Sequence, residues 1–299
     1  MAGDVGAATE VYRRLIAADQ RDHAAWRGLG AARLRARAFG EAHDASSRAV
    51  RLRSGDGESW SLLAEALFRL GEVEQAIEAY RRASMDSALQ ALAEENIAIM
   101  APGSASAGNA GVLAARCAFG RRLASGIRPV DRPPRPPSAG KLRIGYVSAF
   151  FDSANWMKPV YGVINHHDRE AFEVHLVSLG GDPSAEAGYQ DYAHDVIWQV
   201  GSLDNEKVAG LIAAAGIDVL VDLNAYSAPK GLRLFLRRPA PVQIGWFNSF
   251  ATYGLHCFDA IVGDDVAIPR AEERYFVERV LRVPGTYLAF DVRYAVPDV

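Results

Sequence analysis

LRIGYVSAFFDSANWMKP, residues 142–159, is the stretch that decides the fold of the second half of the chain. It begins with an alternating apolar run over residues 142–147, which is typical of a buried strand. Small and polar residues follow, up to Lys158 and Pro159. In an open parallel sheet, ligands bind where the chain leaves the carboxyl end of a strand. We therefore expect a binding site within residues 148–158.

Downstream of this stretch, apolar runs alternate with helix-like segments. Strands are predicted at 172–179, 196–200, 217–223, 242–246, 260–262 and 280–283. Helices are predicted at 160–167, 203–215 and 232–237, with a short one between 183 and 196. Strands that alternate with helices indicate a Rossmann-like, doubly wound parallel sheet. We therefore expect an α/β domain over residues 141–299.

Upstream, residues 1–86 carry an internal repeat with a period of 34. Trp26 and Trp60 are 34 residues apart, and so are Ala42 and Ala76. The predicted helix pairs are 24–36 with 39–52, and 58–70 with 73–85. The period and the W-x-x-L-G pattern that begins at Trp26 resemble the tetratricopeptide repeat. Such helical hairpins bind extended peptides on a concave face, but two repeats could equally serve only to cap the next domain.

Two further segments are expected between the repeat and the α/β domain. Residues 87–125 have a helical pattern and are predicted to form a helical bridge. The stretch RPVDRPPRPP at 128–137 holds five prolines. Proline fixes φ and lacks an N–H group, so it is unsuited to a helix interior or a central strand. We predict an extended, proline-rich linker at 126–140.

Composition narrows the functional classes. The 299 residues have a formal charge of −3, from 33 basic and 36 acidic side chains, so nothing favours nucleic acid or an anionic membrane surface. Cys117 and Cys257 form no paired pattern, which disfavours a disulfide framework or a zinc site and fits the reducing cytoplasm. No secretory signal and no apolar run long enough for a membrane span is present.

Motifs for common cofactors are missing from the sequence. The first predicted strand is not followed by GxGxxG, which disfavours NAD and FAD, and neither a P-loop nor HExxH occurs. We therefore expect no bound cofactor and no metal. The adjacent His166 and His167 are interpreted as part of a solvated face.

Several segments together resemble one enzyme family. They are RIGYVS at 143–148, IDVLVDLN at 217–224, RRPAPVQIGW at 237–246, T-x-G at 252–254 and D-x-I at 259–261. In order and spacing they are similar to the catalytic region of the O-linked N-acetylglucosamine transferases and their Spindly relatives. Tetratricopeptide repeats placed before that region are the layout of the same family. The resemblance covers about 141–292 for the catalytic part and about 1–86 for the repeats.

The resemblance implies a GT-B glycosyltransferase, whose two Rossmann-like lobes enclose a nucleotide sugar. Its members transfer a sugar from UDP-GlcNAc, or from GDP-fucose in the Spindly branch, to Ser or Thr hydroxyls of proteins, with inversion and without a metal. The expected partners are thus the nucleotide sugar as co-substrate and a protein or peptide acceptor, which the repeats could hold. Because Val299 lies near the expected end of the first lobe, we expect the N-terminal part of such an enzyme, inactive alone.

The resemblance also suggests site residues. Relatives carry S-x-D-F-x-x-H-P after the first strand, and ungapped counting places Ala154 at the histidine. Asn155 and Lys158 are left as the candidate catalytic residues, since an amide can hydrogen-bond a hydroxyl or phosphate and an ammonium supplies positive charge. The candidate substrate-binding residues are Ser148, Asp222, Asn224, Tyr226, Asn248 and Thr252.

Other interpretations remain open at this stage. Asn155 could simply cap a helix that begins near Trp156, and Lys158 could be an exposed helix residue. The missing histidine favours a repeat-based binding scaffold whose lobe has lost catalysis. A GT-B relative such as a nucleotide-sugar epimerase is a third option, which the repeats disfavour.

Overall fold

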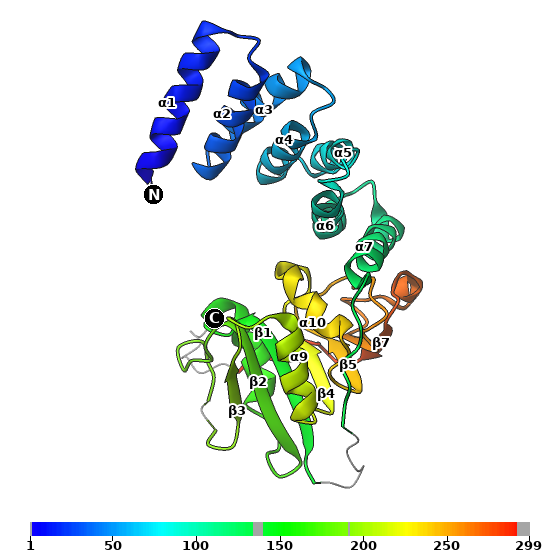
Figure 1. Cartoon of the computed structure of the whole chain (residues 1–299). Coiled ribbons are helices and arrows are strands. Elements are labelled where there is room, and N and C mark those ends of the chain that lie inside the picture. Colours follow the sequence, from blue (N-terminus) through cyan, green and yellow to red (C-terminus); the bar gives the residue numbers. More distant parts are fainter. Residues whose placement is uncertain (1, 134–139, 191, 292–299) are drawn as a thin grey trace, which may run out of the picture. The chain divides into compact units, whose positions relative to one another are not determined.

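The computed structural model of the chain describes residues 2–133, 140–190 and 192–291 (Figure 1). The chain forms two compact units that divide between Phe119 and Gly120, inside the segment predicted as a helical bridge. The first unit is helical, and the second is built around a sheet. No helix among the described residues is both long and apolar enough to cross a membrane.

Consecutive helices make up the first unit. They are α1 (Ala2–Ala18), α2 (His23–Arg35), α3 (Phe39–Leu52), α4 (Gly57–Arg69), α5 (Val73–Ala83), α6 (Gln90–Met100), a 3-10 turn (Ala101–Gly103) and α7 (Gly108–Ala124), which extends past the division. Each predicted helix of the pairs α2/α3 and α4/α5 lies within two residues of the observed bounds. The helical periodicity of this part of the sequence is therefore confirmed.

The two helix pairs repeat the same local structure. Asp22 begins α2 and Asp56 begins α4, and each carboxylate accepts a hydrogen bond from the backbone N–H three residues later. Trp26 and Trp60 each donate the indole N–H to the carbonyl six residues earlier, at 3.0 and 2.8 Å. Both pairs of residues are 34 positions apart. The sequence period is thus a structural period.

The turn inside each helix pair repeats as well. Arg37 and Gly71, again 34 apart, both have a left-handed backbone, with φ of 57° and 86°. Ala42 and Ala76 in the following helices are fully buried, so the helices approach closely at these two positions. Only glycine adopts the left-handed conformation without steric cost, and Arg37 therefore carries a local strain that Gly71 avoids.

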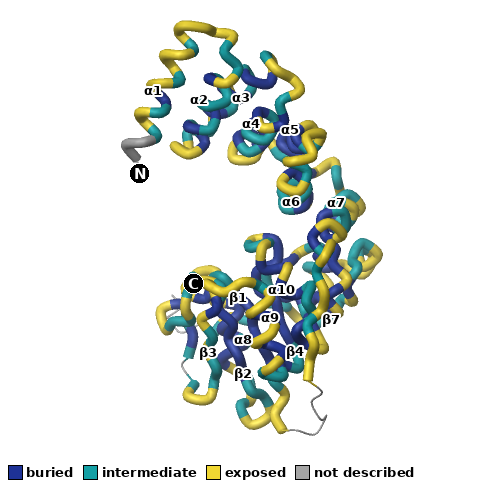
Figure 2. The backbone as a smooth tube through the Cα atoms, viewed as in Figure 1, coloured by how far each residue is buried: buried dark blue, intermediate teal, exposed yellow. Residues whose placement is uncertain are grey.

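The second unit contains one parallel sheet of seven strands. Its strands are β1 (Leu142–Phe150), β2 (Phe172–Gly181), β3 (Val196–Gln199), β4 (Val219–Asp222), β5 (Val242–Gly245), β6 (Ala260–Gly263) and β7 (Arg279–Arg282). Their order is β3-β2-β1-β4-β5-β6-β7, and every neighbouring pair is parallel. All seven correspond to predicted strands, and the buried residues gather along β1, β2 and β4 (Figure 2). The predicted doubly wound α/β fold is confirmed.

Three α-helices connect the strands. They are α8 (Ala154–Ile164), α9 (Asn205–Ala214) and α10 (Leu232–Leu236), with 3-10 turns at Ala225–Ser227, Pro229–Gly231 and Arg270–Tyr275. Helix α8 begins six residues earlier than predicted and contains Pro159. A proline in the second turn removes one backbone hydrogen bond, yet the helix is retained because Val160 and Ile164 are fully buried in the core. The short helix predicted between 183 and 196 is wrong, since the described residues there form only turns and β3 starts at 196.

Two glycines inside strands allow close packing. A Cβ atom on Gly145 of β1 would lie 2.9 Å from the side chain of Leu220 on β4. A Cβ atom on Gly245 of β5 would lie 2.2 Å from the ring of Tyr253. Contacts this short are shorter than real Cβ contacts, so the sheet accommodates neither side chain without rearrangement.

The predicted proline-rich linker, 126–140, lies partly outside the described residues, because 134–139 are not among them. Residues 127–133 have neither helix nor strand, as the prolines predicted. The backbone N–H of Val130 donates to the carbonyl of Arg237 at 2.8 Å. This part of the segment is therefore held against the second unit.

Candidate functional site

The strand order creates a topological switch at β1. The chain runs from β1 outward to β2 and β3 on one side, then returns to β4 on the other side and continues to β7. In open parallel sheets this reversal leaves a crevice at the carboxyl ends of the two strands where it occurs. The loops after β1 and β4, together with the loop after the neighbouring β5, therefore form the candidate site.

Asn224, the second residue after β4, connects these loops. Its side chain is 1% exposed, and its Oδ1 accepts a hydrogen bond from the backbone N–H of Ala149 on β1 at 2.8 Å. Its backbone carbonyl accepts a second bond, at 2.8 Å, from the amide of Asn248 in the loop after β5. The predicted ligand contact is thus a residue whose polar atoms join the ends of three strands.

Asp222, the last residue of β4, holds the backbone of the same loop. Its carboxylate is 1% exposed and accepts hydrogen bonds from the backbone N–H groups of Asn224, at 3.1 Å, and Ala225, at 2.8 Å. Burial raises the pKa of Asp222 from 3.8 to about 6, and these bonds limit the rise. Ala225 has a left-handed backbone, with φ of 45°. The carboxylate therefore holds a strained turn in place rather than facing solvent.

Asn248 and Tyr226 also bond within the protein. The Asn248 amide donates to the hydroxyl of Ser227 at 2.7 Å, in addition to its bond with the backbone of Asn224. The Tyr226 hydroxyl is buried and donates to the carbonyl of Tyr253 at 2.7 Å. Ser227, which was not among the predicted site residues, is exposed and lies beside Asn248 at the open edge.

Thr252 forms a buried contact with Glu278 that sequence reasoning missed. The threonine hydroxyl donates to the Glu278 carboxylate at 2.7 Å, and the other carboxylate oxygen accepts the backbone N–H of Tyr253 at 2.9 Å. Burial raises the pKa of Glu278. The two residues are 26 positions apart, with no shared motif, so no local signal could have linked them. The pair fixes the segment that follows the β5 loop.

The remaining predicted residues divide into buried and exposed groups. Ser148 is fully buried, and its hydroxyl accepts the backbone N–H of Phe150 at 3.0 Å. Asn155 and Lys158 are exposed on α8. The N-cap position of α8 is Ser153 rather than Asn155, so the capping role considered for Asn155 is wrong. These two exposed side chains are therefore the predicted site residues best placed to reach a ligand.

A shallow hollow of about 360 Å³ lies at the start of α8. It is lined by Phe150, Ser153, Ala154, Asn155 and Trp156. Nowhere in the described part of the chain do three His, Cys, Asp or Glu side chains come close enough to hold a metal ion.

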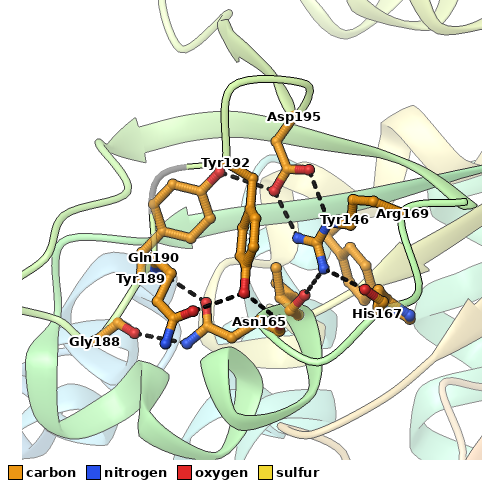
Figure 3. A network of polar contacts seen from close by, with 10 residues as sticks. Tyr146, Asn165, His167, Arg169, Gly188, Tyr189, Gln190, Tyr192 and Asp195 are labelled. Atoms are coloured by element: carbon orange, nitrogen blue, oxygen red, sulfur yellow. Dashed lines mark hydrogen bonds and ion pairs between the residues drawn. The ribbon is translucent and has the colours of Figure 1, made fainter.

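The opposite end of α8 is anchored by Asn165 (Figure 3). Its amide donates to the carbonyl of Gly188 at 2.9 Å, and its Oδ1 accepts the backbone N–H of Gln190 at 3.0 Å. The Tyr192 hydroxyl donates to the backbone carbonyl of Asn165 at 2.6 Å. The helix that lines the hollow is therefore fixed at the end away from it.

Arg169 completes this anchor (Figure 3). It donates to both carboxylate oxygens of Asp195, at 3.1 and 2.7 Å, in the bidentate geometry that makes such pairs strong. The neighbouring His167 lies 2.6 Å from the hydroxyl of buried Tyr146. Burial and the Arg169 charge lower the pKa of His167. The interpretation of His167 as part of a solvated face is therefore wrong, whereas His166 is exposed.

The signature RRPAPVQ stabilises the sheet. Arg238, with φ of 50°, donates to the carbonyl of Cys257 at 2.7 Å and to the carboxylate of Asp259 at 3.1 Å. The buried Gln243 amide donates to the same Cys257 carbonyl at 2.7 Å, and Asp259 accepts the Gln243 backbone N–H. The RRPAPVQ segment thus connects β5 by hydrogen bonds to the residues just before β6.

Comparisons with known proteins agree with this geometry. One similar protein is the probable UDP-N-acetylglucosamine–peptide N-acetylglucosaminyltransferase SEC of Arabidopsis thaliana, 27% identical over 161 residues, or 53% of this chain and 16% of that protein. The corresponding enzyme of Caenorhabditis elegans is 28% identical over 153 residues, or 50% of this chain and 13% of that protein. A mutant O-GlcNAc transferase of Thermobaculum terrenum has a similar structure, with a TM-score of 0.73 and 28% identity over 96% of this chain and 55% of that one.

The chain thus spans less than a fifth of the length of these curated relatives and about half of the solved one. The solved relative matches residues of both units, since the match covers 96% of this chain. The profile of glycosyl transferase family 41 matches residues 130–299, which is more than half of the chain and includes the whole sheet. On this match the chain belongs to glycosyl transferase family 41.

Proposed function

We propose that this chain supplies the helical arm and the first lobe of a GT-B protein glycosyltransferase. The observation that carries the proposal is the family match over residues 130–299. These residues contain the parallel sheet whose strand order reverses at β1, and ligands bind at such a reversal in open parallel sheets. We further propose that the donor is UDP-GlcNAc or a related nucleotide sugar and the acceptor a Ser or Thr hydroxyl. The similar proteins of Arabidopsis thaliana and Caenorhabditis elegans are named as UDP-N-acetylglucosamine–peptide N-acetylglucosaminyltransferases, which supports this choice.

The helical unit is proposed to be a tetratricopeptide array that presents the acceptor protein. The repeated caps at Asp22 and Asp56, and the repeated turns at Arg37 and Gly71, support it. The lobe uses no metal in this proposal, and transfer takes place in the cytoplasm. Groups that neutralise the departing diphosphate are proposed to lie outside the 299 residues.

Asn155 and Lys158 take the ligand-facing roles. Both are exposed on α8 near the carboxyl end of β1, where an acceptor hydroxyl or a sugar phosphate would enter the crevice. The amide of Asn155 can hydrogen-bond a hydroxyl, and the ammonium of Lys158 attracts negative charge. The buried Asp222 and Asn224, together with the partly exposed Asn248, keep the loops after β4 and β5 in position.

The experiment is a transfer assay on the complete protein encoded by the gene, with labelled UDP-GlcNAc and GDP-fucose and an array of Ser- and Thr-containing peptides. Asn155→Ala and Lys158→Ala should each lower the rate at least about tenfold, or about 1.4 kcal/mol. Lys207→Ala, which removes an exposed lysine from α9, is the matched control and should leave the rate unchanged. Absence of transfer from both donors would refute the proposal.

A non-catalytic protein-binding scaffold is the second candidate. Two points favour it. Ungapped counting against the motif of the resembling family places Ala154 at its histidine, and Asp222, Asn224 and Asn248 form hydrogen bonds within the protein. If the complete protein captures peptides through its helical arm but transfers no sugar to them, the scaffold is the correct function.

A further inference from the structure

Trp156 presents an indole ring at the edge of the candidate site. It lies in the first turn of α8, and 39% of its surface is exposed. Its ring contacts Phe150 at a centroid distance of 5.6 Å and Phe247 at 6.0 Å, the latter nearly perpendicular at 87°. We call Phe150, Trp156 and Phe247 the aromatic ledge. The two phenylalanines fix the indole, so a ligand that stacks on it would not have to order a mobile side chain.

The backbone of Phe247 supports a functional role for this arrangement. Its φ is 71°, in the left-handed region that is costly for any residue with a Cβ atom. Strain of this kind persists only where the surroundings impose it, and it gathers at binding and active sites. Here the strained residue is the second after the end of β5 and brings its ring against Trp156.

The hollow beside the ledge is lined by three apolar and two polar residues. Its volume is about 360 Å³, and Phe150, Ala154 and Trp156 supply the apolar wall. Ser153 and Asn155 add a hydroxyl and an amide to the same lining. The Ser153 side chain makes no capping bond to the helix. An apolar surface with a few polar groups at its margin is the usual composition of a small-ligand site.

A hexopyranose has the complementary chemistry. One face of the ring is a patch of C–H groups that packs on an aromatic plane, and its equatorial hydroxyls project outward to hydrogen-bonding groups. We infer that the aromatic ledge is a carbohydrate subsite, in which a hexopyranose stacks on Trp156 while Ser153 and Asn155 bind its hydroxyls. The choice of a sugar rests on the proposed function. A nucleoside base could also stack on an indole, so the test must separate the two.

Saturation-transfer NMR on the 299-residue chain tests this inference. The probes are methyl N-acetyl-β-glucosaminide, methyl β-glucoside and uridine. We expect strong saturation transfer to the ring protons of both glycosides and little saturation transfer to the protons of uridine. Trp156→Ala should weaken glycoside binding about fivefold, whereas Trp156→Tyr, which keeps an aromatic face and the fold, should retain most of it. Trp198→Ala, on β3 against His175, is the matched control and should bind normally.

The inference is overturned if the glycosides receive no saturation, if Trp156→Ala and Trp198→Ala bind equally, or if only uridine responds to the loss of Trp156. These outcomes are independent of the transfer assay. Transfer without glycoside binding at the ledge would leave the proposed function intact and remove the subsite. Glycoside binding that depends on Trp156, without transfer by the complete protein, would keep the subsite and remove the proposed function.

Discussion

Replacing Asn224 tests whether the centre of the crevice is a structural junction. In Asn224→Ala the backbone N–H of Ala149, a half-buried residue, loses its acceptor at 2.8 Å, the side-chain oxygen of the buried Asn224. A buried donor without a partner costs about 1–3 kcal/mol. The other two side-chain contacts of Asn224, to Val147 and Asp222, are long at 3.4 and 3.3 Å and add little. We therefore expect a loss of about 2 kcal/mol in the free energy of unfolding.

Asn224→Asp separates the hydrogen bond from the charge. The aspartate keeps an acceptor for Ala149 but places a second carboxyl group about 3.3 Å from that of Asp222. Two carboxylates this close cannot both ionise, so each raises the pKa of the other in the folded state. The folded protein then holds more protons than the unfolded chain, and stability falls as pH rises. Relative to wild type, the variant should lose stability progressively above the unfolded pKa of about 3.8, so it should be distinctly less stable at pH 8 than at pH 5.

Urea unfolding followed by hydrogen exchange of peptides that cover β1 is the assay, because it reports on the second unit specifically. Asn205→Ala is the matched control. Its amide bonds the carbonyl of Lys230 on the surface, so the change should cost less than about 0.5 kcal/mol. The reasoning is refuted if Asn224→Ala is as stable as the control, or if Asn224→Asp has the same relative stability at pH 5 and pH 8.

Three further predictions concern packing, capping and backbone strain. Gly245→Ala should destabilise the second unit by about 1–3 kcal/mol through overpacking against Tyr253. Gly210→Ala, at an open position in α9, should instead stabilise it by about 0.5–1 kcal/mol. Thermal unfolding should therefore show a lower melting temperature for the first variant and a higher one for the second. Asp56→Ala removes a helix cap and should cost about 1 kcal/mol at pH 7. Burial tends to raise the pKa of Asp56, but bonds from Ser59 and the Arg27 charge outweigh it and lower the pKa. This contribution is therefore complete above about pH 3.8 and is lost as the pH falls from there through the lower folded pKa; urea midpoints that differ equally at pH 7 and pH 3 would contradict it. Gly71→Ala should cost about 1 kcal/mol, because alanine tolerates the left-handed backbone poorly; an unchanged melting temperature would argue against the strain.

The sequence predicted those parts of the fold that depend on local pattern. Apolar runs of three to eight residues located all seven strands, because both faces of a parallel sheet are buried. The 34-residue period located the helix pairs. The start of α8 was misplaced because Pro159 was interpreted as the end of the polar stretch before the helix, while tertiary burial of Val160 and Ile164 maintains the helix across it.

The candidate site was predictable in position but not in detail. The switch-point rule directed attention to residues 148–158 and to the end of β4, and the structure brings these loops together through Asn224. The partners of the polar side chains could not be foreseen, because they come from distant positions. Glu278 meets Thr252, and His167 meets Tyr146, only through the fold. Residue type at a strand end thus indicates polarity but not whether the polar atoms face a ligand or the protein.

The junction at Asn224 has a consequence for altering this protein by directed evolution. Because its bonds tie three strand ends together, randomising residues 222–227 would mostly yield variants that fail to assemble the crevice. The first turn of α8 carries exposed side chains on a helix anchored at its far end by Asn165. A library restricted to Ser153, Asn155, Trp156 and Lys158 would therefore explore new binding preferences while leaving the supporting framework untouched.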